Sequence, residues 1–185
     1  PIREPGRQHE AHVCMIEDIS ARIASEEELR KLSRAVEQSQ ASIVITNVEA
    51  DIEYVNEAFL LRTGYSRGEV VGRNPRILKS GETPRTTYVA LWHALQRGET
   101  WAGEFTNRKK DGSTYVEQAV ISPLRQPDGT ITHYVAVKED ITDEKRLTAE
   151  LARHRDHLME LVAERTPELD VAREQAETAN QAKRP

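Results

Sequence analysis

Cysteine is almost absent from this sequence of 185 residues, which contains only Cys14. A single cysteine excludes an internal disulfide framework and is typical of a reducing compartment. Long basic runs are also missing, and a formal net charge of −5 gives no sign of a nucleic-acid-binding surface. No stretch approaches the roughly 18 consecutive apolar residues of a membrane-spanning helix, and residues 1–15 lack the apolar block of a signal peptide. We therefore expect a cytoplasmic chain that neither inserts into a membrane nor binds nucleic acid.

Aromatic residues are few, and all of them lie in one part of the chain. Both Trp, both Phe and all five Tyr fall between Tyr54 and Tyr134, so the core should be there. The two ends are rich in Glu, Arg, Ala and Gln, a composition typical of solvated helix. The sequence therefore predicts one central domain with helical extensions.

The central segment, residues 41–143, alternates between strand and helix patterns. Residues 42–46 and 52–55 predict two strands, and three more antiparallel strands are expected between residues 101 and 139. Three or four short helices separate the two groups, with Asn56 and Ser66 as expected N-caps. Because these helices can cover only one face of a five-stranded sheet, the predicted fold class is α+β.

The residues before this domain predict a flanking helix and, ahead of it, the end of another domain. Ser25 and Glu28 form a capping-box pattern, which indicates a flanking helix over residues 25–40. In residues 1–24, a short apolar run leads into Glu-Asp-Ile-Ser, and a similar pattern recurs at residues 134–142. We interpret residues 1–24 as the end and linker of a preceding domain of the same kind. A chance match over six residues is the alternative.

Residues 144–185 predict a long helix with a narrow apolar stripe that starts at Leu147, Leu151 and Leu158. Such a stripe needs a partner, and a parallel homodimeric coiled coil would bury it. The alternative is a single charged helix that packs back on the domain. The spacing changes near Val162, and this stutter would allow two nearly equal packings. Pro167 lacks an N–H group, so we expect a kink or a break there, with Thr166 able to cap a restarted helix.

Two enzyme motifs occur without the context that they need. Residues 64–68 match G-x-S-x-G, but a helix rather than a strand is expected before them, so Ser66 is interpreted as a helix cap. Residues 154–156 read His-Arg-Asp inside a charged helix, without the companion motifs of a kinase. His154 and His157 lie on similar sides of that helix, but no other ligands complete a metal site. We therefore expect neither a catalytic nor a metal site.

Residues 41–143 resemble a PAS domain with its C-terminal PAC region. The matching segments are residues 43–55, 56–59, 63–66, 71–76, 101–104, 107–112 and 129–142. Residues 161–166 and 175–183 resemble the connector before the dimerisation domain of a histidine kinase. The resemblance implies a sensor histidine kinase of a two-component system, in which this segment neither binds ATP nor phosphorylates a substrate.

Residues 72–79 are similar to the flavin-contacting helix of LOV photosensors, a subclass of PAS domains. Pro75 stands where LOV photochemistry needs a cysteine, so no cysteinyl adduct can form. Of the amide side chains around the LOV flavin, Asn74 and Asn107 remain. The other amide positions hold Lys79, Glu117 and Lys138. The similarity therefore does not extend to a LOV photocycle.

A second resemblance is to the PAS domains of flavin redox sensors of the aerotaxis and nitrogen-fixation type. It rests on Trp92, on Trp-Ala-Gly at residues 101–103 and on Asn-Arg-Lys-Lys at residues 107–110. This resemblance implies non-covalent FAD, and the candidate cofactor-binding residues are Asn74, Trp92, Trp101 and Asn107. The alternatives are a cofactor-free dimerisation or interaction module, with both Trp residues in the core, and a small organic ligand. Heme is a further alternative, through His93, which is expected to face solvent.

Asp140, Ile141 and Thr142 lie where the last strand gives way to the output helix. A distortion of the sheet has to pass through them to reach that helix. Asp140 can cap the helix or pair with a cation, and Thr142 can also cap it. These residues are therefore the candidate signal relay. The sequence predicts a signal-sensing and dimerising module that passes a redox or ligand signal to a coiled coil.

Overall fold

The computed structural model describes residues 20–181, with side chains as far as residue 167. Five antiparallel strands form one sheet in the order β2-β1-β5-β4-β3. They are β1 (Ser42–Asn47), β2 (Ile52–Val55), β3 (Trp101–Arg108), β4 (Thr114–Arg125) and β5 (Ile131–Asp140). The segment between β2 and β3 forms α2 (Glu57–Thr63), α3 (Arg67–Val70), the 3-10 helix η1 (Pro75–Leu78) and α4 (Arg85–Gln96). The predicted α+β fold with a five-stranded antiparallel sheet is confirmed.

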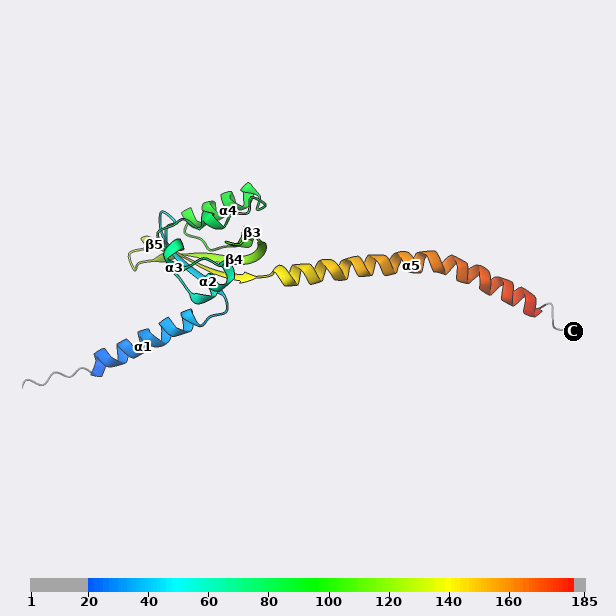
Figure 1. The fold of residues 1–185 in the computed structure, drawn as a ribbon, viewed down its shortest axis with the longest axis horizontal. Coiled ribbons are helices and arrows are strands. Elements are labelled where there is room, and N and C mark those ends of the chain that lie inside the picture. Colours follow the sequence, from blue (N-terminus) through cyan, green and yellow to red (C-terminus); the bar gives the residue numbers. More distant parts are fainter. Residues whose placement is uncertain (1–19, 182–185) are drawn as a thin grey trace, which may run out of the picture.

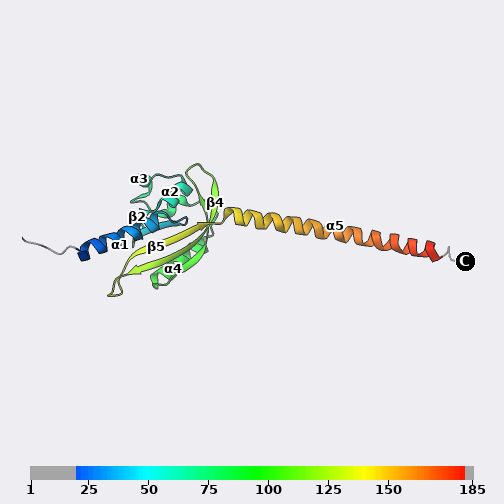
Figure 2. The same ribbon diagram turned by 90° about the horizontal axis from the view of Figure 1, so that it is seen from below.

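Two longer helices flank the domain, α1 (Ser20–Glu37) and α5 (Thr142–Gln181). Figures 1 and 2 show that both helices lead away from the sheet, while α2, α3 and α4 stay close to it. No helix within residues 20–181 is both long and apolar enough to cross a bilayer. The central domain and its two flanking helices are therefore distinct parts of the described chain.

The two predicted caps hold the short helices in place. The side chain of Asn56 accepts hydrogen bonds from the amides of Phe59 at 3.2 Å and Ile43 at 2.9 Å. Its Nδ2 donates to the carbonyl oxygens of Ala41 and Val36, at 2.9 and 3.1 Å. Because Asn56 is fully buried and all these bonds are made, it fixes the end of α1, the start of β1 and the start of α2 together. Ser66 forms a capping box at the start of α3, as predicted.

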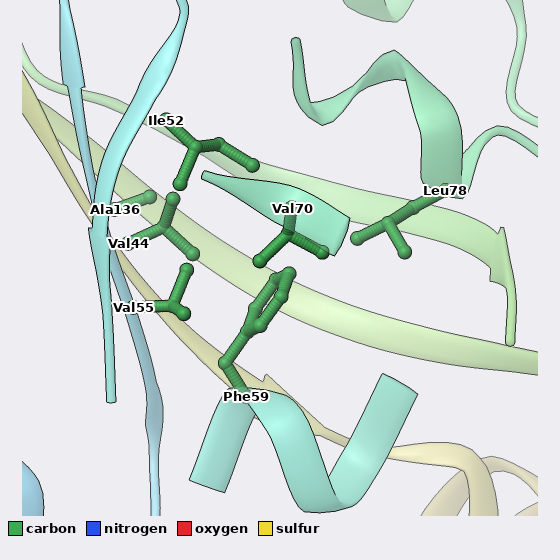
Figure 3. Close-up of a cluster of buried hydrophobic side chains, with 7 residues drawn as sticks. All are labelled: Val44, Ile52, Val55, Phe59, Val70, Leu78 and Ala136. Carbon is green, nitrogen blue, oxygen red and sulfur yellow. The ribbon is translucent and has the colours of Figure 1, made fainter. Parts of the chain in front are cut away.

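The core has two parts that lie along the sheet. Figure 3 shows the first, in which Phe59 of α2 and Val70 of α3 point toward the side chains of β1 and β2. Its members are Val44, Ile52, Val55, Phe59, Val70, Leu78 and Ala136. The second part packs α4 on β3 and β4 through Leu91, Leu95, Trp101, Phe105 and Ala119. Each of the larger side chains, such as Val, Leu, Ile or Phe, contributes about 1.5–3 kcal/mol by leaving water, so both parts hold the helices on the sheet.

The first flanking helix differs from its predicted bounds. It is already helical at Ser20, the first described residue, and it ends at Glu37 rather than at residue 40. Residues 20–24 are compatible with a helix, so the capping-box pattern at Ser25 does not mark the first turn. The interpretation of residues 1–24 as a remnant falls mainly on residues 1–19, which lie outside the described part of the chain.

The long helix α5 is continuous through Pro167, so the break that we considered there is absent. Thr166 donates its hydroxyl to the carbonyl oxygen of Val162 at 2.7 Å, which is a bond within the helix rather than a cap for a new one. Figure 1 shows α5 curving over its second half. Leu147, Leu151 and Leu158 are 61–72% exposed, so the helix does not bury this part of its stripe on its own domain. The side chains expected to continue the stripe after residue 167 lie outside the described residues.

Candidate functional site: a partly open cavity next to the junction of β5 and α5

A cavity lies between the inner face of the sheet, η1 and α4. The space inside it that admits water-sized groups is about 160 Å³, which is smaller than the roughly 300–1,000 Å³ of small-molecule sites, and its mouth is open to solvent. Most of its wall is apolar or aromatic, and its polar side chains come from β1, β3, β5 and the segment around η1. The principal lining residues are Val44, Asn74, Arg76, Lys79, Tyr88, Leu91, Trp92, Leu95, Phe105, Asn107, Ile121, Tyr134, Ala136 and Lys138.

Two pairs of rings form the aromatic part of the wall. Tyr88 of α4 stacks on Phe105 of β3, with 5.6 Å between ring centroids and 27° between planes. Trp92 of α4 meets Tyr134 of β5 edge to face, with centroids 6.1 Å apart. Trp92 is 38% exposed, so its ring lies toward solvent rather than deep in the core. Flat aromatic walls of this kind favour a planar ligand.

Asn107 and Lys138 reach one buried carboxylate from the cavity wall. Asn107 donates its Nδ2 to Oε1 of Glu117 at 2.8 Å, and the ammonium of Lys138 lies 2.6 Å from the same oxygen. Glu117 is 1% exposed and Lys138 is 6% exposed. A buried ion pair has a large desolvation cost and is weak evidence for a purely stabilising role. Its position beside a cavity makes it a candidate functional group.

Tyr115 lies next to this pair on the same face of β4. Its side chain is 2% exposed, and its hydroxyl is the buried side-chain polar atom that has no hydrogen-bond partner within the described part of the chain. Burial, and then the nearby Glu117 carboxylate, raise the pKa of Tyr115 above its ordinary value. The hydroxyl therefore keeps its proton. It is close enough to the side chains of Asn107 and Glu117 to affect its pKa, but it makes no hydrogen bond of good geometry to either within the described residues.

The structure brings three of the four predicted cofactor-binding residues to one cavity. Asn74, Trp92 and Asn107 line it, and Asn74 also caps η1 by accepting from the amide of Arg76 at 3.1 Å. Trp101 does not line it. The Trp101 ring is 9% exposed and lies 5.0 Å from the ring of Phe105 in the second part of the core, beside a separate surface groove.

Trp101 is displaced from the cavity because its ring lies along β3 over Gly103. A Cβ atom on Gly103 would come within 2.4 Å of Cζ2 of Trp101. Sequence reasoning also missed Tyr88 and Tyr134 as wall residues. The alternation of Tyr134, Ala136 and Lys138 along β5 was the available signal, because residues two apart on a strand share a face.

Two other expectations concern histidines and metals. His93 is exposed, as expected, and its Nδ1 lies 3.1 Å from Nη1 of Arg97. It is not among the residues that line the cavity. The described residues contain no group of three or more His, Cys, Asp and Glu side chains that could hold a metal ion.

The junction after β5 is fastened directly to β4. The amide of Ile141 donates to the carbonyl oxygen of Val116, and the amide of Val116 donates to Oγ1 of Thr142, each at 2.9 Å. The hydroxyl and the amide of Thr142 both donate to Oδ1 of Asp140, the amide at 3.0 Å. Asp140 also lies 3.7 Å from Nε of Arg62 on α2. The first turn of α5 is therefore tied to the sheet and to α2 through three consecutive residues.

The cavity and the junction are neighbours in the sheet. Asp140 lies directly opposite Glu117 in the β4–β5 register. Lys138 is two residues before Asp140 and therefore shares its face of β5. The buried pair of Glu117 and Lys138 is thus one residue pair away from the start of α5.

This arrangement agrees with the comparison to known families, in which the pattern of the PAS domain matches residues 40–143, more than half of the chain. The chain belongs to the PAS domain family. PAS domains are sensory, non-catalytic modules, so this chain is a PAS sensory domain with two helical extensions.

Relatives of this PAS domain occur in regulators and in sensor kinases. The chain is 37% identical over 132 residues to the nitrogen fixation regulatory protein of Klebsiella oxytoca, covering 71% of this chain and 26% of the relative. It is 30% identical over 139 residues to blue-light-activated histidine kinase 1 of Erythrobacter litoralis, covering 68% and 38%. The chain thus spans only about a quarter of the first of these relatives.

A solved structure with a similar fold is that of an RNA-binding light-oxygen-voltage receptor. It superposes with a TM-score of 0.61 at 27% identity, over 78% of this chain and 43% of the other. The PAS domain therefore has structural neighbours of the LOV type, although Pro75 occupies the position where the LOV resemblance calls for a cysteine.

Proposed function

We propose that this chain is the flavin-binding, redox-sensing module of a sensor histidine kinase. The observation that carries the proposal is the cavity, which combines flat aromatic walls with the amide side chains of Asn74 and Asn107. These features fit a planar heterocycle that needs hydrogen bonds along one edge. Pro75 removes adduct photochemistry, so a redox signal is favoured over light.

Asn74 and Asn107 would hold the polar edge of the flavin, and Trp92 would flank it. Trp101 would act indirectly, by positioning the ring of Phe105. An open groove continues from the mouth of the cavity along α4, shares Lys79 and Trp92 with it, and includes Arg85. The two cations would suit a diphosphate, which supports FAD over a shorter flavin. The bound flavin would supply reversible electron transfer, and the residues of the chain would bind it and read its state.

The relay would run through Asp140, Ile141 and Thr142. Their bonds join α5 to β4 and α2, so a shift of β5 would change the start of the output helix. The pairing of Glu117 with Asp140 supports this route, because a residue behind the cavity wall lies directly opposite the first residue of the junction.

Dimerisation through the flanking helices is the second part of the proposal. Leu29 and Leu32 of α1 are about as exposed as Leu147, Leu151 and Leu158 of α5, and an exposed apolar stripe on each helix indicates a missing partner. A homodimer would bury both stripes and would continue into kinase domains of the same chain. The similarity to a histidine kinase supports this output. The same exposed stripes favour the alternative function, a cofactor-free dimerisation module.

Binding of FAD separates the two functions. We expect the purified chain to bind FAD, as measured by the quenching of flavin fluorescence during titration. Leu91→Trp should abolish binding, because Leu91 is buried and faces the cavity. Thr86→Trp, an equally large change at an exposed site of the same helix, should bind as the wild type does. Equal binding by both variants would place the flavin elsewhere, and no binding by any of the three proteins would favour the cofactor-free module.

A further inference from the structure

The charges around the cavity are unbalanced. Arg76, Lys79 and Lys138 line it, whereas the nearest buried carboxylate, Glu117, lies behind the wall and is held by Lys138 and Asn107. A cation that faces a low-dielectric cavity attracts a negative group strongly. Lys138 can therefore be drawn toward an anionic ligand, but only if Glu117 finds another donor.

Tyr115 is positioned to be that donor. Residues 115 and 117 share a face of β4, and the hydroxyl of Tyr115 is buried without a partner in the described part of the chain. An unsatisfied buried hydroxyl costs free energy, so it gains most from a new acceptor. In the structure, Oε1 of Glu117 already accepts from both Asn107 and Lys138. Departure of Lys138 would leave the buried carboxylate with one donor fewer, so Glu117 would gain more from a hydrogen bond donated by Tyr115.

We propose that Lys138, Glu117 and Tyr115 form a partner-exchange switch that senses negative charge on the bound ligand. With a neutral ligand, Lys138 pairs with Glu117 and the Tyr115 hydroxyl has no partner. With a ligand ring that has gained a negative charge, Lys138 turns to the ligand and Tyr115 donates to Glu117. The inference rests on the proposed function, since a flavin ring gains one negative charge when it takes up two electrons and one proton.

The exchange would reach the output helix through the shortest available path. Nη1 of Arg62 donates to the backbone oxygen of Lys138 at 3.4 Å, and Nε of the same residue lies 3.7 Å from Asp140. Glu117 is the direct cross-strand neighbour of Asp140. Movement of the Lys138 side chain would therefore act on the part of β5 that Arg62 holds. Arg62 contacts the backbone oxygen of Lys138 and also Asp140, the next residue on the same face of the strand.

The test compares the affinities of the full chain for oxidised FAD and for FAD reduced with excess dithionite under anaerobic conditions. The wild type should bind the reduced form about tenfold more tightly, which raises the two-electron midpoint potential of the bound flavin by about 30 mV. Lys138→Gln should lose this preference while still binding oxidised FAD. Tyr115→Phe should bind oxidised FAD normally and lose part of the preference, because Glu117 then lacks a second donor.

Lys79→Gln is the matched control. Lys79 also lines the cavity, but its ammonium lies over the Tyr88 ring, 3.9 Å from the centroid, rather than on a carboxylate. If Lys79→Gln lost as much of the preference for reduced FAD as Lys138→Gln, the positive charge around the cavity as a whole would explain the preference. That result would refute the switch. The reduced-minus-oxidised infrared spectrum should contain a Tyr115 band that is absent in Tyr115→Phe and weak in Lys138→Gln.

The outcomes separate the switch from the proposed function. Binding of neither form of FAD by the wild type would overturn both. Equal affinity for the two forms, or a difference spectrum without a Tyr115 band, would overturn the switch and leave the flavin site standing.

Discussion

Removal of the Asp140 carboxylate should loosen the start of α5 without unfolding the domain. Asp140→Ala deletes an acceptor for the amide and hydroxyl of Thr142, together with an ion pair to Arg62 in which both side chains are about one-quarter exposed. Loss of a capping-type acceptor costs roughly 1 kcal/mol, and a partly exposed ion pair adds about 0.5 kcal/mol. The free energy of opening the first turn should therefore fall by about 1.5 kcal/mol.

Amide hydrogen exchange measures this loss where it occurs. The amide of Lys145, which donates to the carbonyl oxygen of Ile141 at 2.9 Å, should exchange about tenfold faster in the variant. Amides of the central strands should change little. In the full-length protein, Asp140→Ala should also remove the difference in output between oxidising and reducing conditions.

Asp140→Asn is the matched control, because an amide oxygen can still accept from Thr142 while the charge toward Arg62 is lost. It should retain most of the protection at Lys145 and most of the signal response. Unchanged exchange in Asp140→Ala, or a normal response of that variant, would refute the role of this residue as a relay.

Three further predictions concern stability. Tyr115→Phe should leave the free energy of unfolding in urea unchanged or raise it by up to about 1 kcal/mol, because the buried hydroxyl has no partner among the described residues; a loss of 2 kcal/mol would reveal a bond that the structure lacks. Gly103→Ala should cost about 1–3 kcal/mol and shift the fluorescence of Trp101, whose ring occupies the space of the new Cβ; an unshifted spectrum would contradict this packing. The pKa of Glu69 is lowered from 4.5 to about 2, first by its hydrogen bond with Lys110, so its stabilising effect is complete above about pH 4.5 and disappears as pH falls to about 2. Glu69→Gln should therefore make the loss of stability over that range shallower, and urea unfolding at several acidic pH values that gives parallel curves for the two proteins would contradict the shift.

The sheet and the short helices could be predicted because local signals agree with the final structure. Turn residues separate alternating apolar runs, and the Asn56 and Ser66 caps lie at the starts of α2 and α3. The start of α1 could not be placed, because residues 20–24 are compatible with a helix and the capping-box pattern at Ser25 therefore marks no boundary. Capping patterns in the sequence thus located the starts of the short helices α2 and α3, but they did not locate the start of the flanking helix α1.

The candidate site was only partly predictable. Asn74 and Asn107 could be picked out from the motif pattern, but alternation along β3 gives the face of Trp101 and not its depth, so its exclusion from the cavity was not foreseen. The contact between Lys138 and Glu117 depends on the β4–β5 register, which places Ala119 and not Glu117 directly opposite Lys138. Their side chains meet diagonally, and a diagonal contact between strands depends on side-chain conformation as well as on spacing.

The absorption spectrum of the purified chain tests the central claim most directly. If the cavity is a flavin site, the protein should show the visible bands of oxidised flavin, which bleach with dithionite and return in air. Denaturation should release FAD at about one molecule per chain. A colourless protein that neither carries flavin nor takes it up from solution would contradict the account.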